Sequence, residues 1–183
     1  RFGERLLAEL RGVVDAQGNA PFWDGVAGRF FGMSFRDADE FNALHGNQFI
    51  ADLMPKNPIY VNMISDEARE AIAVTHESGR PARRMLEAEG FRFENYVDIF
   101  DAGPTMIART DQVKTIAETQ PATLAPSPAS KGQRALVAAG ELRDFRCAVA
   151  RVETLDDGAL AVDAEAASAL KLNPGDRLCW APR

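Results

Sequence analysis

The sequence predicts an α+β fold in which a larger mixed region is followed by a small β-rich module. Over residues 1–118, capped helical patterns alternate with short apolar stretches that suit strands. Residues 119–132, TQPATLAPSPASKG, are rich in Pro, Ala, Ser and Thr, which is typical of a linker because proline fixes its backbone dihedral and donates no hydrogen bond. Residues 133–183 show short strand patterns separated by turns. We therefore expect three zones along the chain.

The first apolar stretch, RLLAELRGVV at residues 5–14, allows two interpretations. Its apolar side chains fit one face of a helix: Leu6, Leu7, Leu10, Val13 and Val14. The stretch is short, however, and Gly12 lies inside it. A buried strand therefore stays open as the alternative.

Three helices are predicted next, at residues 20–31, 34–46 and 47–55. Pro21 suits the first turn of the first helix, and Ser34 is a good N-cap for the second. Four aromatic side chains recur at helical spacing in the first helix and are expected in the core: Phe22, Trp23, Phe30 and Phe31.

The rest of the first region reads as strand, helix, helix and hairpin. Residues 58–64, PIYVNMI, are rich in β-formers and predict a strand. Residues 65–75 predict a helix capped by Ser65, with acidic side chains in its first turn. Residues 81–91 predict a helix that starts at Pro81 and stops at Gly90. Residues 91–109 then predict a β-hairpin with its turn in DAGP, residues 101–104.

The C-terminal zone predicts three or four short strands and one short helix. The turns are expected at LDDG, residues 155–158, and at NPGD, residues 173–176. The helix is expected at residues 164–172. No pattern in this zone points to chemistry, so we expect the candidate site in the first region.

Composition excludes several classes of function. Hydrophobic residues make up 46% of the 183 residues and charged residues 26%, which is typical of a globular protein. The net charge of −6 argues against nucleic acid as a partner, and no stretch approaches the roughly 20 apolar residues of a membrane span. Cys147 and Cys179 form no CxxC motif. Their separation argues against a metal site and favours a reducing cytoplasm.

A resemblance to a known family sharpens the functional prediction. The segment ARRMLEAEGFRFENYVDIF, residues 82–100, resembles the closing helix–strand element of the acyl-CoA-dependent N-acyltransferases, the GNAT superfamily. Four segments together resemble the arginine N-succinyltransferase family, in order and at similar spacing: residues 8–35, 49–62, 81–91 and 96–105. The C-terminal zone resembles that family's C-terminal β region more loosely.

The resemblance implies a fold, a reaction and partners. The fold would be a GNAT-like mixed sheet with flanking helices, plus the small C-terminal β module. The reaction would transfer a succinyl group from succinyl-CoA to the α-amine of L-arginine, the first step of the succinyl route of arginine breakdown. It would need succinyl-CoA as cosubstrate and no bound cofactor. Relatives also imply assembly into a homo- or hetero-oligomer.

The same resemblance implies that the chain corresponds to the C-terminal portion of the catalytic region. In the family, a phosphate-binding loop of the form Arg/Gln-x-x-Gly-x-Gly/Ala precedes the matched segments. Here only AQGNA, residues 16–20, comes near it, and it lacks the spacing and the following helix. A phosphate cradle needs successive backbone N–H groups at a helix N-terminus. We therefore expect much of the CoA site to be missing.

His76 is the candidate catalytic residue. Many members of the wider superfamily protonate the leaving thiolate with a tyrosine in the helix before Gly-Phe, but the matching residue here is Leu86. The resemblance implies that His76, in THESGRPAR, is the donor instead. A histidine, with an ordinary pKa near ~6.5, can both accept and donate a proton at cellular pH. The alternative is a solvated loop residue without a role. His45, the other histidine, matches no family histidine, and we expect it to be structural or on the surface.

The candidate substrate-binding residues follow from the charges of the two substrates. A guanidinium favours carboxylates, and the far carboxylate of the succinyl group favours Arg or Lys. In the matched segments these types are supplied by Glu9, Arg11, Lys56, Asp98 and Asp101. Ordinary surface charge or ion pairing also explains each of them.

One departure leaves the substrate open. Relatives usually carry histidine where this chain has Asn57, so ornithine or another amine, or another acyl-CoA, stays an alternative. A non-catalytic subunit that binds arginine or ornithine is a further alternative.

Overall fold

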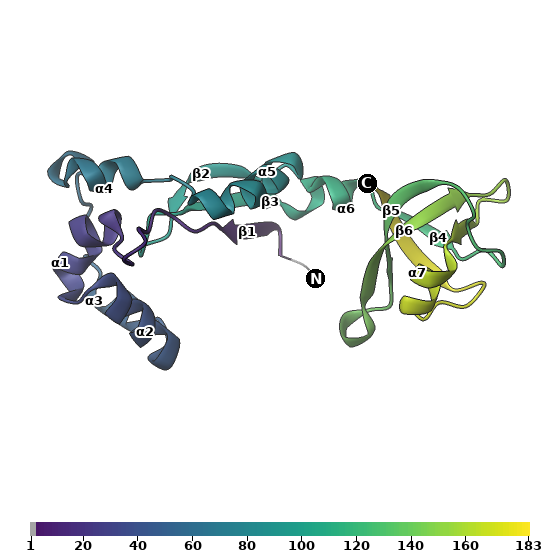
Figure 1. Cartoon of the computed structure of the whole chain (residues 1–183), viewed down its shortest axis with the longest axis horizontal. Coiled ribbons are helices and arrows are strands. Elements are labelled where there is room, and N and C mark those ends of the chain that lie inside the picture. Colours follow the sequence, from purple (N-terminus) through teal and green to yellow (C-terminus); the bar gives the residue numbers. More distant parts are fainter. Residues whose placement is uncertain (1–2) are drawn as a thin grey trace. The chain divides into compact units, whose positions relative to one another are not determined.

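The computed structural model describes residues 3–183 and divides them between two compact units, Arg1–Thr110 and Asp111–Arg183 (Figure 1). Each unit combines one sheet with helices. The α+β class predicted from the sequence is therefore confirmed. Within the first unit, helices α1, α2 and α3 gather at one end and strands β1 to β3 at the other (Figure 1).

The sheet of the first unit has the strand order β1-β3-β2, and both pairings are antiparallel. Its strands are β1 (Arg5–Glu9), β2 (Arg92–Val97) and β3 (Pro104–Arg109). The central strand β3 is buried, whereas β1 lies at an edge and Leu7 is 66% exposed. The strand interpretation of the first apolar stretch thus holds for residues 5–9, but that strand is not buried.

The hairpin predicted at residues 91–109 is confirmed, with a longer turn than expected. The amide of Asp98 donates to the carbonyl of Gly103 at 2.9 Å, and the amide of Ala102 donates to the carbonyl of Asp98 at 3.0 Å. The connection therefore runs from Asp98 to Gly103 rather than through residues 101–104 alone. Strand β2 bulges between Phe93 and Val97, and such a bulge bends a strand locally.

Two glycines let residues 10–12 lie directly against this hairpin turn. A Cβ on Gly103 would stand 1.9 Å from the carbonyl oxygen of Leu10, and a Cβ on Gly12 would stand 2.1 Å from that of Asp101. No side chain fits at either position without moving the backbone. In the sequence, Gly12 argued against a helix. In the structure, its lack of a side chain lets its backbone approach that of the hairpin turn closely.

The helices predicted at residues 20–31, 34–46 and 47–55 are present. They are formed by the π-helix η1 (Trp23–Ala27) with α1 (Gly28–Phe31), by α2 (Phe35–His45) and by α3 (Gln48–Leu53). The Oγ of Ser34 accepts a hydrogen bond from the amide of Asp37 at 3.2 Å and caps α2 as predicted.

Trp23 forms the centre of the aromatic core of the first unit. Its ring stacks on Phe31 and Phe100 at centroid distances of 5.0 and 5.2 Å, and its Nε1 donates to the carbonyl of Met33 at 2.9 Å. Phe22 is also buried. The expectation that all four aromatic side chains lie in the core is wrong for Phe30, which is 44% exposed.

The strand predicted at residues 58–64 is wrong. This segment contains the short 3-10 helix η2 (Val61–Met63), and Tyr60 and Met63 are 71% and 78% exposed. Helix α4 (Asp66–Ala71) follows, capped by Ser65 as predicted. It ends four residues earlier than expected, and Ala73, just beyond its end, adopts a φ of 62°, which a right-handed helix cannot contain.

The helix before the hairpin agrees with its prediction. The 3-10 turn η3 (Glu77–Gly79) leads into α5 (Arg80–Ala88), with Pro81 in its first turn. Gly90 follows with a φ of 96°, the left-handed conformation that commonly ends a helix.

The second unit is built on a five-stranded antiparallel sheet with the order β4-β8-β5-β6-β7. Its strands are β4 (Gln120–Thr123), β5 (Gln133–Ala139), β6 (Arg146–Thr154), β7 (Leu160–Val162) and β8 (Arg177–Pro182). Its helices are α6 (Lys114–Ala117), η5 (Leu142–Asp144) and α7 (Ala164–Ala169), and the 3-10 turn η4 (Thr110–Gln112) begins at the last residue of the first unit. The amide of Ala125 donates to the carbonyl of Leu160 at 2.9 Å, so the segment after β4 meets β7 and the sheet nearly closes on itself.

The domain bounds predicted from the sequence need correction. Residues 120–123, placed in the linker, form β4 and pair with β8, and the boundary between the units falls at Thr110. Leu124, from the same stretch, belongs to the core of the second unit. Residues 133–183 contain four strands, within the predicted three or four, and the predicted helix and both turns are present.

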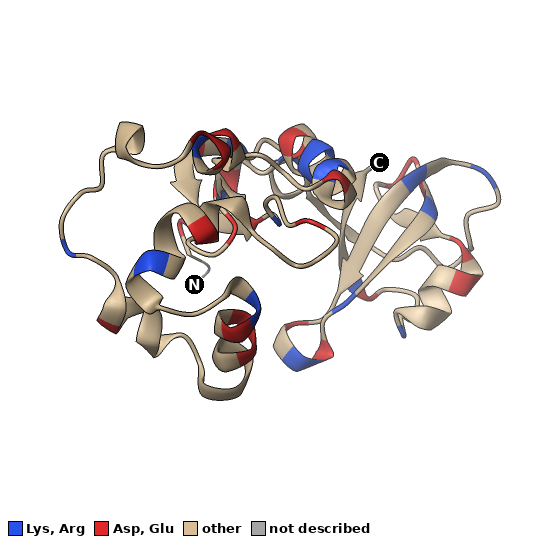
Figure 2. Cartoon of the chain, turned by 60° about the vertical axis from the view of Figure 1, so that its left-hand side comes forward, with Lys and Arg blue, Asp and Glu red and all other residues tan. Residues whose placement is uncertain are grey.

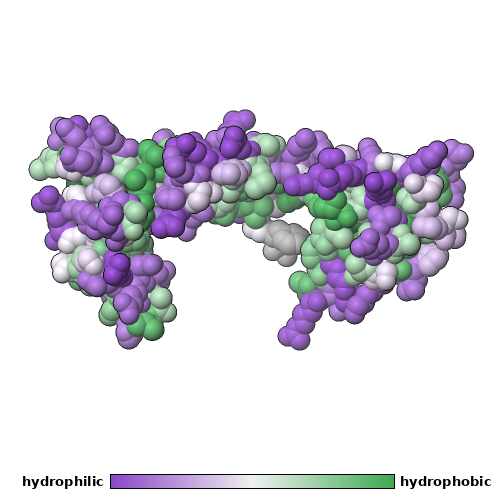
Figure 3. Space-filling view, viewed as in Figure 1, coloured by the Kyte–Doolittle hydropathy of each residue, from purple (hydrophilic) through white to green (hydrophobic). Residues whose placement is uncertain are grey.

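Acidic and basic residues are interspersed along the chain in Figure 2. The face of the molecule drawn in Figure 3 is mostly hydrophilic, with smaller hydrophobic patches between the hydrophilic residues. Among residues 3–183, no helix has the length and apolar character needed to cross a membrane.

Candidate functional site

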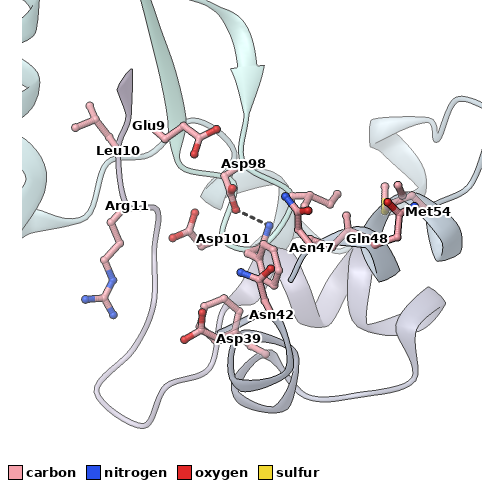
Figure 4. Close-up of a pocket in the computed structure, with 15 residues that line it drawn as sticks. Glu9, Leu10, Arg11, Asp39, Asn42, Asn47, Gln48, Met54, Asp98 and Asp101 are labelled. Atoms are coloured by element: carbon pink, nitrogen blue, oxygen red, sulfur yellow. Dashed lines mark hydrogen bonds between the residues drawn. The ribbon is translucent and has the colours of Figure 1, made fainter. Parts of the chain in front are cut away.

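An open pocket of about 940 Å³ lies in the first unit, between the end of β1, the hairpin turn and helices α2 and α3 (Figure 4). Its polar lining includes four carboxylates, three amides and one guanidinium: Glu9, Asp39, Asp98, Asp101, Asn42, Asn47, Gln48 and Arg11. The excess of carboxylates makes the pocket suited to a ligand with a positively charged group.

The hairpin turn positions two of the carboxylates. Oδ1 of Asp98 accepts a hydrogen bond from the amide of Phe100 at 2.7 Å, and Oδ1 of Asp101 accepts one from the amide of Gly103 at 2.8 Å. Asp101 is only 9% exposed, and Figure 4 shows its carboxylate directed into the space beside the segment that carries Arg11. Both side chains are therefore held by the backbone of the turn itself.

Burial raises the pKa of the Asp98 carboxyl above its ordinary value. The hydrogen bond from the amide of Phe100 opposes this shift, and the negative charge of Asp101 adds to it. A cationic ligand group placed between the two aspartates would relieve both the repulsion and the loss of solvation.

Glu9 and Arg11 reach the pocket from the end of β1. Glu9 is the last residue of that strand and pairs with Thr105, and the amide of Leu10 donates to the carbonyl of Pro104 at 3.1 Å. Arg11 follows and contributes a cation to the pocket wall. Its carbonyl accepts a hydrogen bond from the amide of His76 at 2.8 Å.

His76 lies at the N-terminus of the turn η3 and is half-buried. Its Nδ1 accepts a hydrogen bond from the amide of Ser78 at 3.2 Å and lies 2.7 Å from the Oγ of Ser78. His76 does not itself line the pocket, but its backbone is joined to the pocket wall through Arg11. A second backbone bond, from the amide of Ala73 to the carbonyl of Ala102 at 2.9 Å, joins the same loop to the hairpin turn.

The segment before His76 is also fixed to helix α5. Thr75 is 5% exposed, and its Oγ1 accepts a hydrogen bond from Nη1 of Arg83 at 3.2 Å. Nε of Arg83 donates to Glu87 at 2.9 Å. The loop that carries His76 is therefore attached to the β1 segment, to the hairpin turn and to α5.

The pocket brings together four of the five substrate-binding candidates. Glu9, Arg11, Asp98 and Asp101 all line it, whereas Lys56 does not. The Nζ of Lys56 donates to the carbonyl of Ala51 at 2.9 Å. His45 is exposed at the end of α2, with its ring centroid 4.5 Å from that of Phe41.

Four polar lining residues were not found from the sequence: Asp39, Asn42, Asn47 and Gln48. Asp39 and Asn42 lie three residues apart on α2, a spacing that places both on one helix face. That spacing could have indicated a shared role. Asn47 and Gln48 left no such signal because they occur at a helix start, where amides are common for local reasons.

The fold and the pocket together define an α+β protein with a polar, carboxylate-rich pocket beside a histidine-bearing turn. The family described as arginine N-succinyltransferase beta subunit matches residues 1–115, and the C-terminal domain of that subunit matches residues 120–182. The chain belongs to this arginine N-succinyltransferase family. The second match begins at β4, in agreement with the structural unit rather than with a module that starts at residue 133.

Named relatives and a solved structure agree with this assignment. Arginine N-succinyltransferase from Escherichia coli strain 55989 is 40% identical over 180 residues, which span 97% of this chain and 52% of that protein. Arginine N-succinyltransferase subunit beta from Pseudomonas aeruginosa is 41% identical over 175 residues, 95% of this chain and 51% of that protein. The structure of arginine/ornithine succinyltransferase subunit AI from Pseudomonas aeruginosa matches with a TM-score of 0.85 and 31% identity, over 99% of this chain and 52% of that one.

The chain spans about half the length of these relatives. The resemblance inferred from four sequence segments is thereby confirmed at the level of the family.

Proposed function

We propose that the protein to which this chain belongs transfers the succinyl group of succinyl-CoA to the α-amine of L-arginine, and that this chain holds arginine and supplies the proton-transferring His76. The observation that carries the proposal is the pocket itself. It gathers Glu9, Asp98 and Asp101 around one space, and the carbonyl of Arg11 on its wall holds the amide of His76 at 2.8 Å. Membership of the succinyltransferase family supports the same reaction.

The charges of the pocket support arginine as the amine. Carboxylates accept the forked N–H groups of a guanidinium in pairs, and Asp98 and Asp101 stand three residues apart on one hydrogen-bonded turn. Asp39 offers a further carboxylate from α2. We assign Arg11 to the far carboxylate of the succinyl group, because its guanidinium is the positively charged group in the pocket lining. Lys56 is a weaker candidate for this contact because it does not line the pocket.

The chemistry requires one proton to be moved twice. The neutral α-amine attacks the thioester carbonyl, a C–N bond forms, and His76 takes the proton that the nitrogen must lose. The C–S bond then breaks, the thiolate of CoA leaves with the electron pair, and His76 returns the proton to sulfur. The products are N2-succinylarginine and free CoA, and His76 ends in its starting state. Succinyl-CoA serves as cosubstrate, and no step requires a metal or bound cofactor.

We also propose a cytoplasmic location and assembly into an oligomer. Cys147 and Cys179 are both free in the structure, which suits a reducing compartment. Assembly is supported by the names of relatives and of the matched structure, which are those of subunits.

The test is release of free thiol from succinyl-CoA by the full-length protein that contains this chain. L-arginine should support turnover, and L-ornithine should be compared at the same concentrations because the matched structure bears both names. A higher kcat/KM for ornithine would reassign the substrate. Binding of arginine by calorimetry without thiol release from any acyl-CoA would instead favour the non-catalytic alternative.

A further inference from the structure

A run of large apolar side chains lies on the surface of the first unit, in the segment 58–64 that joins α3 to α4 (Figure 1). Tyr60, Val61 and Met63 are 71%, 55% and 78% exposed, and Ile59 before them is 38% exposed. Single exposed apolar residues are ordinary on a protein surface, whereas a continuous run of them indicates a surface that a partner covers. Within residues 3–183, no strand pairs with this segment.

The exposed side chains belong to a hydrogen-bonded turn. The amide of Met63 donates to the carbonyl of Tyr60 at 2.9 Å and closes the 3-10 turn η2. The next residue, Ile64, packs against the buried cluster that contains Phe22 and Val26. The segment 58–64, called here the apolar turn, is therefore anchored to the core at its end while its other apolar side chains stay exposed.

A pocket of about 360 Å³ opens beside the apolar turn. The turn and helix α1 supply its large apolar side chains: Pro58, Ile59, Tyr60, Met63, Ile64 and Phe30. Arg29 is the one charged residue in the lining, and its Nε already donates to the carbonyl of Gly25 at 3.1 Å. A substrate site needs several converging polar groups. This pocket instead suits a large apolar side chain, the usual anchor of a protein partner.

The charges near the apolar turn favour a protein partner over a membrane. Lys56 and Arg29 supply two positive charges, and Asp66 and Glu67 at the start of α4 supply two negative ones. All four residues are exposed. A surface that binds anionic lipid needs a clear excess of Lys and Arg, which the apolar turn does not have.

We propose that the apolar turn, together with Phe30, is the surface on which the half of the full-length protein outside this chain docks. The relatives are about twice as long as the matched range, so in a protein of that length a partner of similar size belongs to the same polypeptide. A tethered partner has an effective concentration of millimolar order and covers an apolar surface in every molecule. The inference rests on the proposed function only in that the full-length protein carries this second half.

Hydroxyl-radical footprinting of the full-length protein tests the proposal. Mass spectrometry gives the oxidation rate of each methionine, which follows its exposure to solvent. Met106 is only 1% exposed and serves as the buried reference. We expect Met63, although 78% exposed within this chain, to oxidise in the full-length protein at a rate close to that of Met106. Fast oxidation of Met63 would overturn the proposal.

Dilution identifies what covers the turn. Protection by the other half of the same polypeptide is intramolecular and should not change when the protein is diluted. Protection that is lost on dilution would assign the surface to a second copy or another subunit. Protection that requires vesicles of phosphatidylcholine and phosphatidylglycerol would assign it to a membrane. Either of these two results would overturn the proposal.

A substitution in the turn supplies an independent check. Tyr60→Asp places a charge on the surface that docks, so Met63 should lose its protection, while the exposure of Tyr60 leaves the fold of this chain unaffected. Leu142→Asp is the matched control, because Leu142 is 94% exposed and lies in the second unit. Continued protection of Met63 in Tyr60→Asp, or equal loss in both variants, would count against the apolar turn.

Footprinting needs no turnover, so the two proposals fail separately. A protected Met63 in a protein that releases no thiol from succinyl-CoA would leave the docking surface intact and overturn the proposed reaction. Normal thiol release from a protein with a rapidly oxidised Met63 would overturn the docking surface alone.

Discussion

Gly12 and Asp101 approach so closely that a Cβ on Gly12 would stand 2.1 Å from the carbonyl oxygen of Asp101. This contact joins the segment that carries Arg11 to the turn that carries the pocket aspartates. The neighbouring atoms belong to the backbone, so they cannot rotate away as a side chain would.

Gly12→Ala should therefore destabilise the first unit by about 1–3 kcal/mol, the usual scale of overpacking, and should raise the KM of the full-length protein for arginine. Trp23 and Trp180 lie in different units, so thermal unfolding followed by Trp23 fluorescence in a Trp180→Phe background reports the first unit alone. Gly3→Ala is the matched control, because the nearest atom to its Cβ would be 3.5 Å away. Equal stability of the two variants would contradict the close packing described.

Replacement of His76 should reduce turnover with little effect on folding. His76→Asn keeps a side-chain acceptor for the amide of Ser78 and so preserves the cap, but it cannot exchange a proton near neutral pH. We expect kcat of the full-length protein to fall by about 10²- to 10⁴-fold, with loss of one limb of the pH profile. His45→Asn is the control and should change neither. If His76→Asn retained full kcat, the proposed catalytic role would be wrong and His76 would be an ordinary loop residue.

Asp98→Asn should stabilise the fold at neutral pH while weakening arginine binding. The raised pKa of Asp98, caused first by burial, means that the folded chain binds this proton more tightly than the unfolded chain. The carboxyl therefore favours folding at low pH and loses that contribution as pH rises through its folded pKa. Asparagine stays neutral, so its advantage in unfolding free energy should appear above this window and vanish below the ordinary aspartate value of ~3.9.

The measurement for Asp98 combines denaturant unfolding at several pH values with the KM for arginine. Asp144→Asn is a suitable control, since Asp144 is an exposed residue of the second unit. A stability difference that does not vary with pH would argue against a buried, repelled carboxylate at position 98. An unchanged KM would remove Asp98 from the proposed arginine contacts.

Arg83→Met should loosen the loop that carries His76. It removes the hydrogen bond to the buried Thr75 and the ion pair with Glu87, and the loss of a typical hydrogen bond costs ~1 kcal/mol. We expect a lower kcat and faster amide hydrogen exchange at residues 73–79. Arg84→Met, at the exposed neighbouring position on α5, is the control. Similar exchange rates in both variants would show that Arg83 does not hold the loop.

The sequence predicted the elements that carry strong local signals. Ser34 and Ser65 cap helices as expected, and Gly90 ends α5 as expected. The strand predicted at residues 58–64 failed because β-forming side chains such as Tyr60 and Val61 need a partner strand, and this segment pairs with none in the described structure. Local propensity reports what a segment prefers, whereas a sheet depends on distant residues.

The opposite error occurred at β4. Pro121 and the surrounding small residues predicted a linker, but β4 lies at the edge of its sheet in the order β4-β8-β5-β6-β7. A proline is tolerated on an edge strand because the missing N–H can face solvent. Composition alone could not distinguish an exposed edge from a linker.

Only part of the pocket lining could be predicted, because sequence patterns report local segments and not the tertiary contacts between them. Glu9, Arg11, Asp98 and Asp101 were found from charge within segments of recognisable family. Asp39 lies on α2, outside those segments, and only the tertiary packing of α2 against the hairpin turn brings it to the pocket.

The loop that carries His76 is joined to the pocket by bonds between main-chain atoms, from Ala73 to Ala102 and from His76 to Arg11. Main-chain bonds of this kind do not involve the side chains, although proline cannot donate at positions 73 and 76 and the left-handed backbone of Ala73 and Ala102 disfavours bulky or β-branched residues. The pocket side chains can therefore change without breaking the main-chain bonds that hold the loop of His76 against the pocket wall. Under the proposed function, a change of preferred amine would require only side-chain replacements on a retained main-chain frame.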